Sequence, residues 1–130
     1  MARKVLIVDR SLYNRMILRD ILISHGYSVL EAASGDEAID MYGRLRPDLV
    51  TVDATMPGLD GARAIREIRL RDPNAAVLMC GTRGQRRFVL EGMALGASGV
   101  LMKPFNDRQV LRVIRESMGT APSSEPLSDA

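Results

Sequence analysis

The sequence predicts an α/β domain built on a doubly wound, five-stranded parallel sheet. Short apolar runs rich in β-branched residues recur along the chain and alternate with segments of helical spacing, the pattern of a parallel sheet with helices on both faces. The chain has 130 residues, of which 46% are hydrophobic and 26% are charged. This length and composition fit one globular domain and exclude disordered, collagen-like and coiled-coil classes.

Each expected strand is a short apolar run, as strands buried on both faces of a parallel sheet usually are. In chain order the runs span residues 5–8, 28–32, 49–52, 76–79 and 100–102. All of them are far shorter than a membrane span or the apolar core of a secretory signal. Neither a membrane helix nor a signal peptide is therefore expected.

Capping residues and apolar spacing predict the first two helices. The first should cover about residues 11–25. Its apolar stripe, expected to face the core, consists of Leu12, Met16, Ile17, Ile21 and Leu22. The second helix should begin at a capping box formed by Ser34 and Glu37. It should stop before Pro47, because the residue preceding a proline avoids the helical conformation.

Three further helices are expected in the second half of the chain. The third has a buried stripe at Ala64, Ile65 and Ile68. The fourth should cover about residues 86–95, and the fifth should be capped by Asn106. The buried side of the fifth consists of Val110, Leu111, Val113 and Ile114. After Met118 the pattern gives way to prolines and small polar residues, which predicts a domain of residues 1–118 and a mobile tail or linker over residues 119–130.

Charge and cysteine content limit the possible partners. The chain has 18 basic and 16 acidic residues, and a net charge of +2 is too small to predict nucleic-acid binding. Only two of the basic residues are lysines, Lys4 and Lys103. The single cysteine, Cys80, permits no internal disulfide, which favours a reducing, cytoplasmic location.

Polar residues gather where the predicted strands end. The first strand is followed by Asp9 and Arg10, and the third ends in Asp53. The fourth leads into Gly81, and the fifth leads into Lys103. Ligands of open parallel sheets bind outside the carboxyl ends of the strands, so two carboxylates and a lysine are expected at one candidate site. A purely structural pairing of these acids with the lysine is the alternative.

Three segments together carry a resemblance to a known family. They are residues 5–9 (VLIVD), residues 47–61 (PDLVTVDATMPGLDG) and residues 96–105 (GASGVLMKPF). In this order and spacing, over residues 4–118, the chain resembles the receiver domain of two-component response regulators, and especially the small single-domain chemotaxis type. The resemblance implies the flavodoxin-like receiver fold of five βα units.

The resemblance also implies a phosphorylation site. Asp53 matches the aspartate that takes a phosphoryl group from a histidine kinase or phosphotransfer protein, and Lys103 matches the lysine that pairs with it. Asp9, Asp53 and the backbone carbonyl of Thr55 match the family's magnesium ligands. The family's Lys-Pro peptide bond is typically cis, as Lys103–Pro104 can be here. At most, such a domain promotes its own phosphorylation and dephosphorylation.

Three positions depart from the family's pattern. Arg10 replaces a second metal-binding acid, Gly81 replaces a Ser or Thr whose hydroxyl binds the phosphoryl group, and Val100 replaces a Tyr or Phe that swings inward on activation. Neither Thr82 nor Cys80 is expected to restore the hydroxyl, because successive side chains of an extended segment point to opposite sides. A buried thiol that fills the core is the expected role of Cys80.

Arg10 alters the charge of the predicted site. With Lys103 it offsets the two carboxylates without any metal, and Mg²⁺ needs oxygen ligands that arginine cannot supply. Magnesium, which the family leads one to expect, should therefore bind weakly or not at all. Three roles remain open for the guanidinium: to pair with Asp53, to hold the phosphoryl group, or to point into solvent.

Two functions are compatible with this sequence. One is a receiver phosphorylated on Asp53, and the other is a pseudo-receiver that binds its partner independently of phosphate. In the family, output passes through the face of the fourth helix, fifth strand and fifth helix. On this face the chain has Arg86, Arg87, Arg108, Arg112 and Arg115, which suit an acidic protein partner.

Other roles find less support in the sequence. No DNA-binding segment is recognisable, so direct contact with nucleic acid is not expected, and the chain also fits a piece of a longer regulator. An autonomous enzyme is disfavoured because the chain has no glycine-rich phosphate-binding motif. Its one histidine, His25, is expected far from the strand ends.

Overall fold

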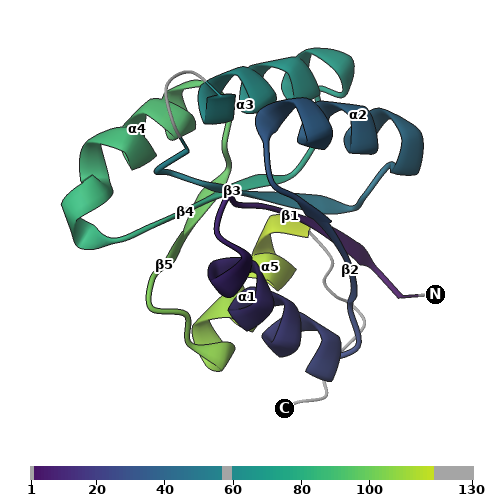
Figure 1. Ribbon diagram of the computed structural model, residues 1–130, viewed down its shortest axis with the longest axis vertical. Helices are drawn as coiled ribbons and strands as arrows, with labels where there is room; N and C mark the ends of the chain where they lie inside the picture. Colours follow the sequence, from purple (N-terminus) through teal and green to yellow (C-terminus); the bar gives the residue numbers. More distant parts are fainter. Residues whose placement is uncertain (1, 57–59, 119–130) are drawn as a thin grey trace.

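The computed structural model describes residues 2–56 and 60–118, and these fold into alternating strands and helices (Figure 1). The strands are β1 (Lys4–Val8), β2 (Ser28–Ala32), β3 (Leu49–Asp53), β4 (Val77–Gly81) and β5 (Gly99–Met102). The α-helices are α1 (Leu12–Ser24), α2 (Gly35–Leu45), α3 (Asp60–Arg71), α4 (Arg86–Ala94) and α5 (Asp107–Met118). A 3₁₀ turn, η1 (Arg83–Gln85), precedes α4. The predicted α/β class is confirmed, and only η1 was not foreseen.

The five strands form one parallel sheet with the order β2-β1-β3-β4-β5. This is the flavodoxin-like order, in which the chain leaves β1 in one direction for β2 and then crosses to the other side for β3. Connections from β1 and β3 therefore diverge and open a crevice at the carboxyl ends of these two strands. The topology places the ends of β1 and β3 at the centre of the candidate site.

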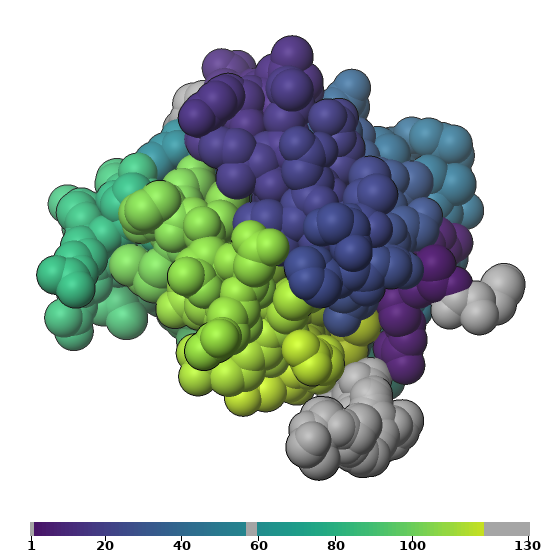
Figure 2. Space-filling view, turned by 90° about the horizontal axis from the view of Figure 1, so that it is seen from below, coloured from purple at the N-terminus to yellow at the C-terminus, as the bar shows by residue number. Residues whose placement is uncertain are grey.

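The sheet is covered on both faces. Helices α2, α3 and α4 lie on one face, and α1 and α5 lie on the other, where Figure 2 shows them packed side by side (Figures 1 and 2). Residues of β1 alternate between the two cores, with Leu6 and Val8 on the first side and Val5 and Ile7 on the second. Burial on both faces explains why the strands are continuous apolar runs.

The predicted N-caps Ser34 and Asn106 are present, but the second half of the Ser34–Glu37 capping box is not, because Glu37 Oε1 accepts from the Ala33 N–H at 2.7 Å instead of from the Ser34 N–H. The Ser34 side chain accepts a hydrogen bond from the Glu37 backbone N–H at 3.1 Å, and Asn106 Oδ1 accepts one from the Gln109 N–H at 3.0 Å. At the start of α1, Ser11 Oγ accepts from the Asn14 N–H at 3.2 Å. Each such cap stabilises its helix by about 1 kcal/mol. The caps fix where each helix begins relative to the strand ends.

Two helices face the core differently from the prediction. In α5 only Val110 and Ile114 are buried, whereas Leu111 and Val113 are half-buried. The buried residues of α1 are Leu18, Ile21 and Leu22, whereas Leu12 and Met16 are 58% and 40% exposed. Because α1 starts beyond the carboxyl end of β1, its first turn has no strand beneath it to pack against. The predicted tail, residues 119–130, lies outside the described residues. Within the described ranges, no helix is long and apolar enough to cross a membrane.

Candidate functional site

Three charged side chains meet at the carboxyl ends of β1, β3 and β5. Lys103 Nζ lies 2.7 Å from Asp53 Oδ1 and 3.5 Å from Asp9 Oδ2. The side chains of Asp9 and Asp53 are 7% and 4% exposed, and that of Lys103 is 14% exposed. The convergence predicted from the strand ends is thus present, as a nearly buried cluster of two carboxylates and one ammonium group.

Backbone hydrogen bonds hold each member of this cluster in place. The Asp9 N–H donates to the Ala32 carbonyl at 3.0 Å, and the Lys103 N–H donates to the Gly81 carbonyl at 2.8 Å. Both residues therefore extend the sheet by one residue beyond their strands. The Lys103–Pro104 peptide bond is cis, as the family resemblance suggested. Asp53 is the last residue of β3, and Asp9 and Lys103 directly follow β1 and β5, so all three side chains project from the ends of paired strands.

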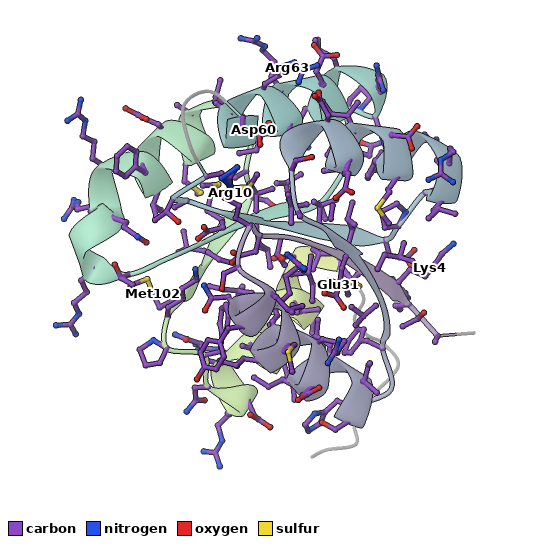
Figure 3. The ribbon with its side chains drawn as sticks, in the orientation of Figure 1. Lys4, Arg10, Glu31, Asp60, Arg63 and Met102 are labelled. Carbon is purple, nitrogen blue, oxygen red and sulfur yellow. The ribbon has the colours of Figure 1, made fainter. Side chains whose placement is uncertain are left out.

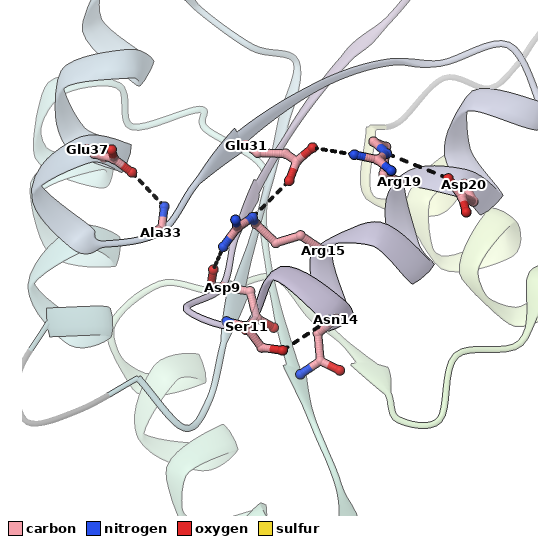
Figure 4. Close-up of polar contacts among 9 residues, drawn as sticks. All are labelled: Asp9, Ser11, Asn14, Arg15, Arg19, Asp20, Glu31, Ala33 and Glu37. Carbon is pink, nitrogen blue, oxygen red and sulfur yellow. Dashed lines mark hydrogen bonds and ion pairs between the residues drawn. The ribbon is translucent and has the colours of Figure 1, made fainter.

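The β1–α1 turn, residues 9–11, is fixed by a second network (Figure 4). The Ser11 N–H donates to Asp9 Oδ1 at 2.8 Å, and Arg15 Nη1 donates to the Asp9 carbonyl at 2.6 Å. Arg15 Nε also donates to Glu31 Oε1 at 2.8 Å, and Arg19 pairs with the other Glu31 oxygen. Burial would raise the pKa of Glu31, but the bonds from the two arginines outweigh it and lower that pKa. The network orients the Asp9 carboxylate toward Lys103.

The pKa values of the cluster follow from burial and charge. Burial raises the pKa of Asp9, and the nearby charge of Asp53 adds to this effect. Burial alone would lower the pKa of Lys103, but the hydrogen bond and charge of Asp53 outweigh it and raise that pKa. Lys103 is therefore a permanent cation at neutral pH. Asp9 is the least favourably placed member of the cluster, because its ionised carboxylate is nearly buried.

The second oxygen of Asp53 has its own donor. Thr55 Oγ1 donates a hydrogen bond to Asp53 Oδ2, so Lys103 and Thr55 each bind one oxygen of the same carboxylate. Thr55 was predicted to neighbour the phosphoryl group together with Gly81 and Thr82, and to offer its backbone carbonyl to a metal, but the bond from its hydroxyl to Asp53 was not predicted. A threonine two residues after a strand-end aspartate is a signal for such a bond, because short hydroxyl side chains readily bond groups two residues away.

Arg10 lies outside the cluster. Its side chain is exposed, and it forms no hydrogen bond or ion pair with any other residue in the described ranges. Figure 3 shows the Arg10 side chain on the same side of the sheet as Asp60, whereas Glu31 lies on the opposite side. Of the three alternatives, a pair with Asp53 is therefore not formed, and the guanidinium points into solvent. The reason is that the Asp9 side chain points inward and the adjacent Arg10 side chain points outward. Lys103 already forms an ion pair with Asp53.

The β4–α4 turn, residues 81–85, has no side-chain oxygen bonded to Asp53. A Cβ built on Gly81 would lie 3.0 Å from Val89 Cγ2 and 3.2 Å from Gln85 Oε1. Gln85 Oε1 accepts a hydrogen bond from the Thr82 backbone N–H at 2.8 Å. The place beside Gly81 is therefore already filled by neighbouring side chains.

Cys80 and Val100 lie close to this turn. Burial raises the pKa of Cys80 to about 12, so its thiol is neutral and packs in the core as expected. Val100 and Arg86 line a cleft of about 470 Å³ between α4 and β5, together with Val89 and Met102. The small valine leaves this cleft open.

The donor set for a metal ion is small. No group of three or more His, Cys, Asp or Glu side chains is placed to hold a metal within residues 2–56 and 60–118. Asp9 and Asp53 are the two acidic side chains at this place, and both carboxylates face the ammonium group of Lys103. A hard, octahedral cation prefers more oxygen ligands and no competing cation.

Comparison with known sequences decides the family. Residues 5–115 match the response regulator receiver domain. The chain belongs to this family. It is similar to the chemotaxis protein CheY of Thermotoga maritima, with 42% identity over 117 residues that cover 89% of this chain and 98% of that protein. Receiver domains are the phosphorelay modules of two-component signalling systems and interact with histidine kinases and phosphotransfer proteins, so the chain is a receiver of such a system.

Solved receiver structures agree with this assignment. The chemotaxis protein CheY4 of Vibrio cholerae superimposes with a TM-score of 0.82 and 32% identity, covering 90% of this chain and 99% of that one. The receiver domain of a sensor histidine kinase from Pseudomonas aeruginosa PAO1 superimposes with a TM-score of 0.83 and 25% identity, covering 92% and 100%. That structure holds a magnesium ion in its active-site cleft. Receiver domains generally bind magnesium.

Proposed function

We propose that Asp53 accepts a phosphoryl group from a histidine kinase or phosphotransfer protein and that the phosphorylated receiver signals through protein contacts. The observation that carries this proposal is the contact of Lys103 Nζ with both carboxylates, at 2.7 Å and 3.5 Å. A carboxylate nucleophile beside a fixed cation is what phosphoryl transfer needs, because the transferred group carries negative charge.

The transfer itself needs no redox partner. One oxygen of Asp53 forms a bond to phosphorus while the bond between phosphorus and the donor's histidine nitrogen breaks, and the electron pair of that bond stays on nitrogen. Lys103 then neutralises part of the charge on the phosphoryl oxygens. The domain therefore acts as a signalling protein and not as an enzyme that turns over an external substrate.

We propose that magnesium binds this receiver weakly or not at all. The support is the small donor set of Asp9, Asp53 and the Thr55 carbonyl, beside which Arg10 brings positive charge where related receivers have an acid. In the free protein Arg10 points into solvent, from where its long side chain is available to the dianionic phosphoryl group. No step of the proposed transfer depends on the metal.

We propose that the downstream partner is an acidic protein surface that docks on α4, β5 and α5. This face carries five exposed arginines, which are Arg86, Arg87, Arg108, Arg112 and Arg115. Arg86 also borders the cleft between α4 and β5, whose lining includes Val89 and Val100. Positive charge around an apolar cleft suits an acidic segment with an apolar anchor.

The proposed acceptor can be tested with a small phosphodonor. Wild type and Asp53→Ala are incubated with phosphoramidate, with and without Mg²⁺, and adducts are counted by intact mass. One phosphoryl adduct on wild type and none on Asp53→Ala is the expected result. No adduct on wild type, either from the small donor or from a cognate kinase, would overturn the proposal and favour a receiver that binds its partner without phosphate.

A further inference from the structure

We propose that the hydroxyl of Thr55 supplies the phosphoryl hydrogen bond that Gly81 cannot supply. The inference rests on the proposed function of Asp53 and adds a residue that touches the reacting group. Thr55 Oγ1 already donates to Asp53 Oδ2, while Lys103 Nζ holds Asp53 Oδ1 at 2.7 Å. The donor is therefore in place on the acceptor carboxylate before any phosphoryl group arrives.

The strand position that usually provides this hydroxyl is closed in this protein. Gly81 has no side chain, and a Cβ there would lie 3.0 Å from Val89 Cγ2, 3.2 Å from Gln85 Oε1 and 3.3 Å from Ala54 Cβ. Val89, Gln85 and Ala54 thus occupy the space into which a serine or threonine would extend. A hydroxyl for the phosphoryl group has to come from another side of Asp53.

Neither Ser11 nor Thr82, which also carry hydroxyls near the strand ends, bonds Asp53 in the described residues, whereas Thr55 does. Ser11 Oγ accepts from the Asn14 N–H, and no hydrogen bond joins Thr82 to Asp53 in the part of the chain that the structure describes. Thr55 is exposed, so its hydroxyl can rotate about one bond on a nanosecond scale without moving the core. These features single out Thr55.

The role of the hydroxyl during transfer follows from its position. As an Asp53 oxygen forms its bond to phosphorus and the donor's P–N bond breaks, the Thr55 hydroxyl keeps its proton and moves its hydrogen bond from Asp53 Oδ2 to a phosphoryl oxygen. Lys103 stays on the other side of the carboxylate. Two donors from two directions then stabilise the charge that develops on the transferred group.

The test compares rates of adduct formation with phosphoramidate. Thr55→Val keeps the shape of the side chain and removes the hydroxyl, and it should slow the reaction by about tenfold, the effect of one lost neutral hydrogen bond. Thr55→Ser keeps the hydroxyl and should react at nearly the wild-type rate. Thr82→Val removes a hydroxyl from the same rim and should not change the rate. Unfolding midpoints of all variants confirm that they are folded.

The outcomes separate this inference from the proposed function. If wild type forms the adduct on Asp53 and Thr55→Val forms it equally fast, the inference fails and the function stands. It also fails if Thr55→Ser is as slow as Thr55→Val, because shape rather than the hydroxyl would then matter. A wild-type protein that never forms an adduct overturns both.

Discussion

The two turns that flank Asp53 differ in how their polar groups are used. In the β1–α1 turn, the Asp9 carboxylate accepts from the Ser11 N–H at 2.8 Å and faces Lys103 Nζ at 3.5 Å. In the β4–α4 turn, the Thr82 N–H and Gln85 Oε1 bond each other at 2.8 Å, and Gly81 adds no side chain. The first turn places a charged carboxylate beside Asp53, whereas the polar groups of the second turn bond each other. The chemistry of this receiver is therefore concentrated on one side of Asp53.

This difference has an energetic side. Burial and the charge of Asp53 raise the pKa of Asp9, so the first turn holds its carboxylate at some cost to stability. The second turn packs Gln85 and Val89 around Gly81 and contains no buried charge. Ionisable groups whose pKa is shifted from its ordinary value are often found at functional sites, which supports the assignment of the first turn to the chemistry.

The largest predicted effect comes from removal of the cation on which the first turn depends. Lys103→Met keeps the length of the side chain and deletes the charge that contacts Asp53 and Asp9. Adduct formation with phosphoramidate should slow by about 100-fold or more, as when a preorganised donor to a developing charge is lost. The measurement is the initial rate followed by intact mass.

A matched change in the second turn sharpens the comparison. Gln85→Ala breaks the bond to the Thr82 N–H. It should lower the unfolding midpoint and leave the rate of adduct formation close to wild type. Equal losses of rate in Lys103→Met and Gln85→Ala would show that both turns contribute to the chemistry and would contradict the distinction drawn between them.

Much of the fold could be predicted from the sequence because local signals agree with the topology. Apolar runs of four or five residues with polar residues at their ends locate the strands, and the rule for strand ends brings Asp9, Asp53 and Lys103 to one place. What could not be predicted depends on direction and on long-range contacts. Arg10 was a candidate partner of Asp53, but only the structure shows that its side chain turns outward.

The residues that hold Asp9 in place could not be predicted for the same reason. Arg15 reaches from α1 to Glu31 on β2 and to the Asp9 carbonyl, and no spacing in the sequence links these residues. The Thr55 hydroxyl is close to Asp53 in the sequence, but its bond depends on Lys103 binding the other oxygen of the carboxylate, which is a long-range contact. Strand positions could be predicted from the sequence, but side-chain rotamers could not.

A smaller effect is expected from restoring an acid in the first turn. Arg10→Asp removes a cation and adds oxygen ligands beside Asp9, so affinity for Mg²⁺ should rise by about tenfold or more, which corresponds to about 1.4 kcal/mol. The measurement is the unfolding midpoint at increasing MgCl₂, because an ion that binds only the folded state raises it.

Arg10→Ala separates charge from ligation. This variant removes the guanidinium, which is exposed in the folded protein, without adding an oxygen. It should gain less magnesium affinity than Arg10→Asp. If wild type already shows as large a magnesium-dependent rise as Arg10→Asp, the proposed weak binding is wrong, and the donors of Asp9, Asp53 and Thr55 suffice.

The smallest predicted effect is on stability. Asp9→Asn keeps an oxygen that accepts from the Ser11 N–H and removes a charge that is 7% exposed. Because folding raises the pKa of Asp9, the folded state prefers the protonated, neutral form, and the neutral asparagine should raise the unfolding midpoint at pH 7. The comparison is made by thermal unfolding of wild type and variant from pH 7 to pH 3.

The pH dependence of this gain identifies its cause. Above the raised pKa the wild type has an ionised Asp9, and the advantage of Asp9→Asn is present in full. As pH falls toward the ordinary value of 3.8, Asp9 becomes protonated in both the folded and the unfolded chain, and the advantage should vanish. Thr82→Val in the second turn changes no titrating group, so its effect on the midpoint should not vary with pH. An advantage of Asp9→Asn that persists unchanged at pH 3 would mean that packing, and not a buried charge, distinguishes the two turns.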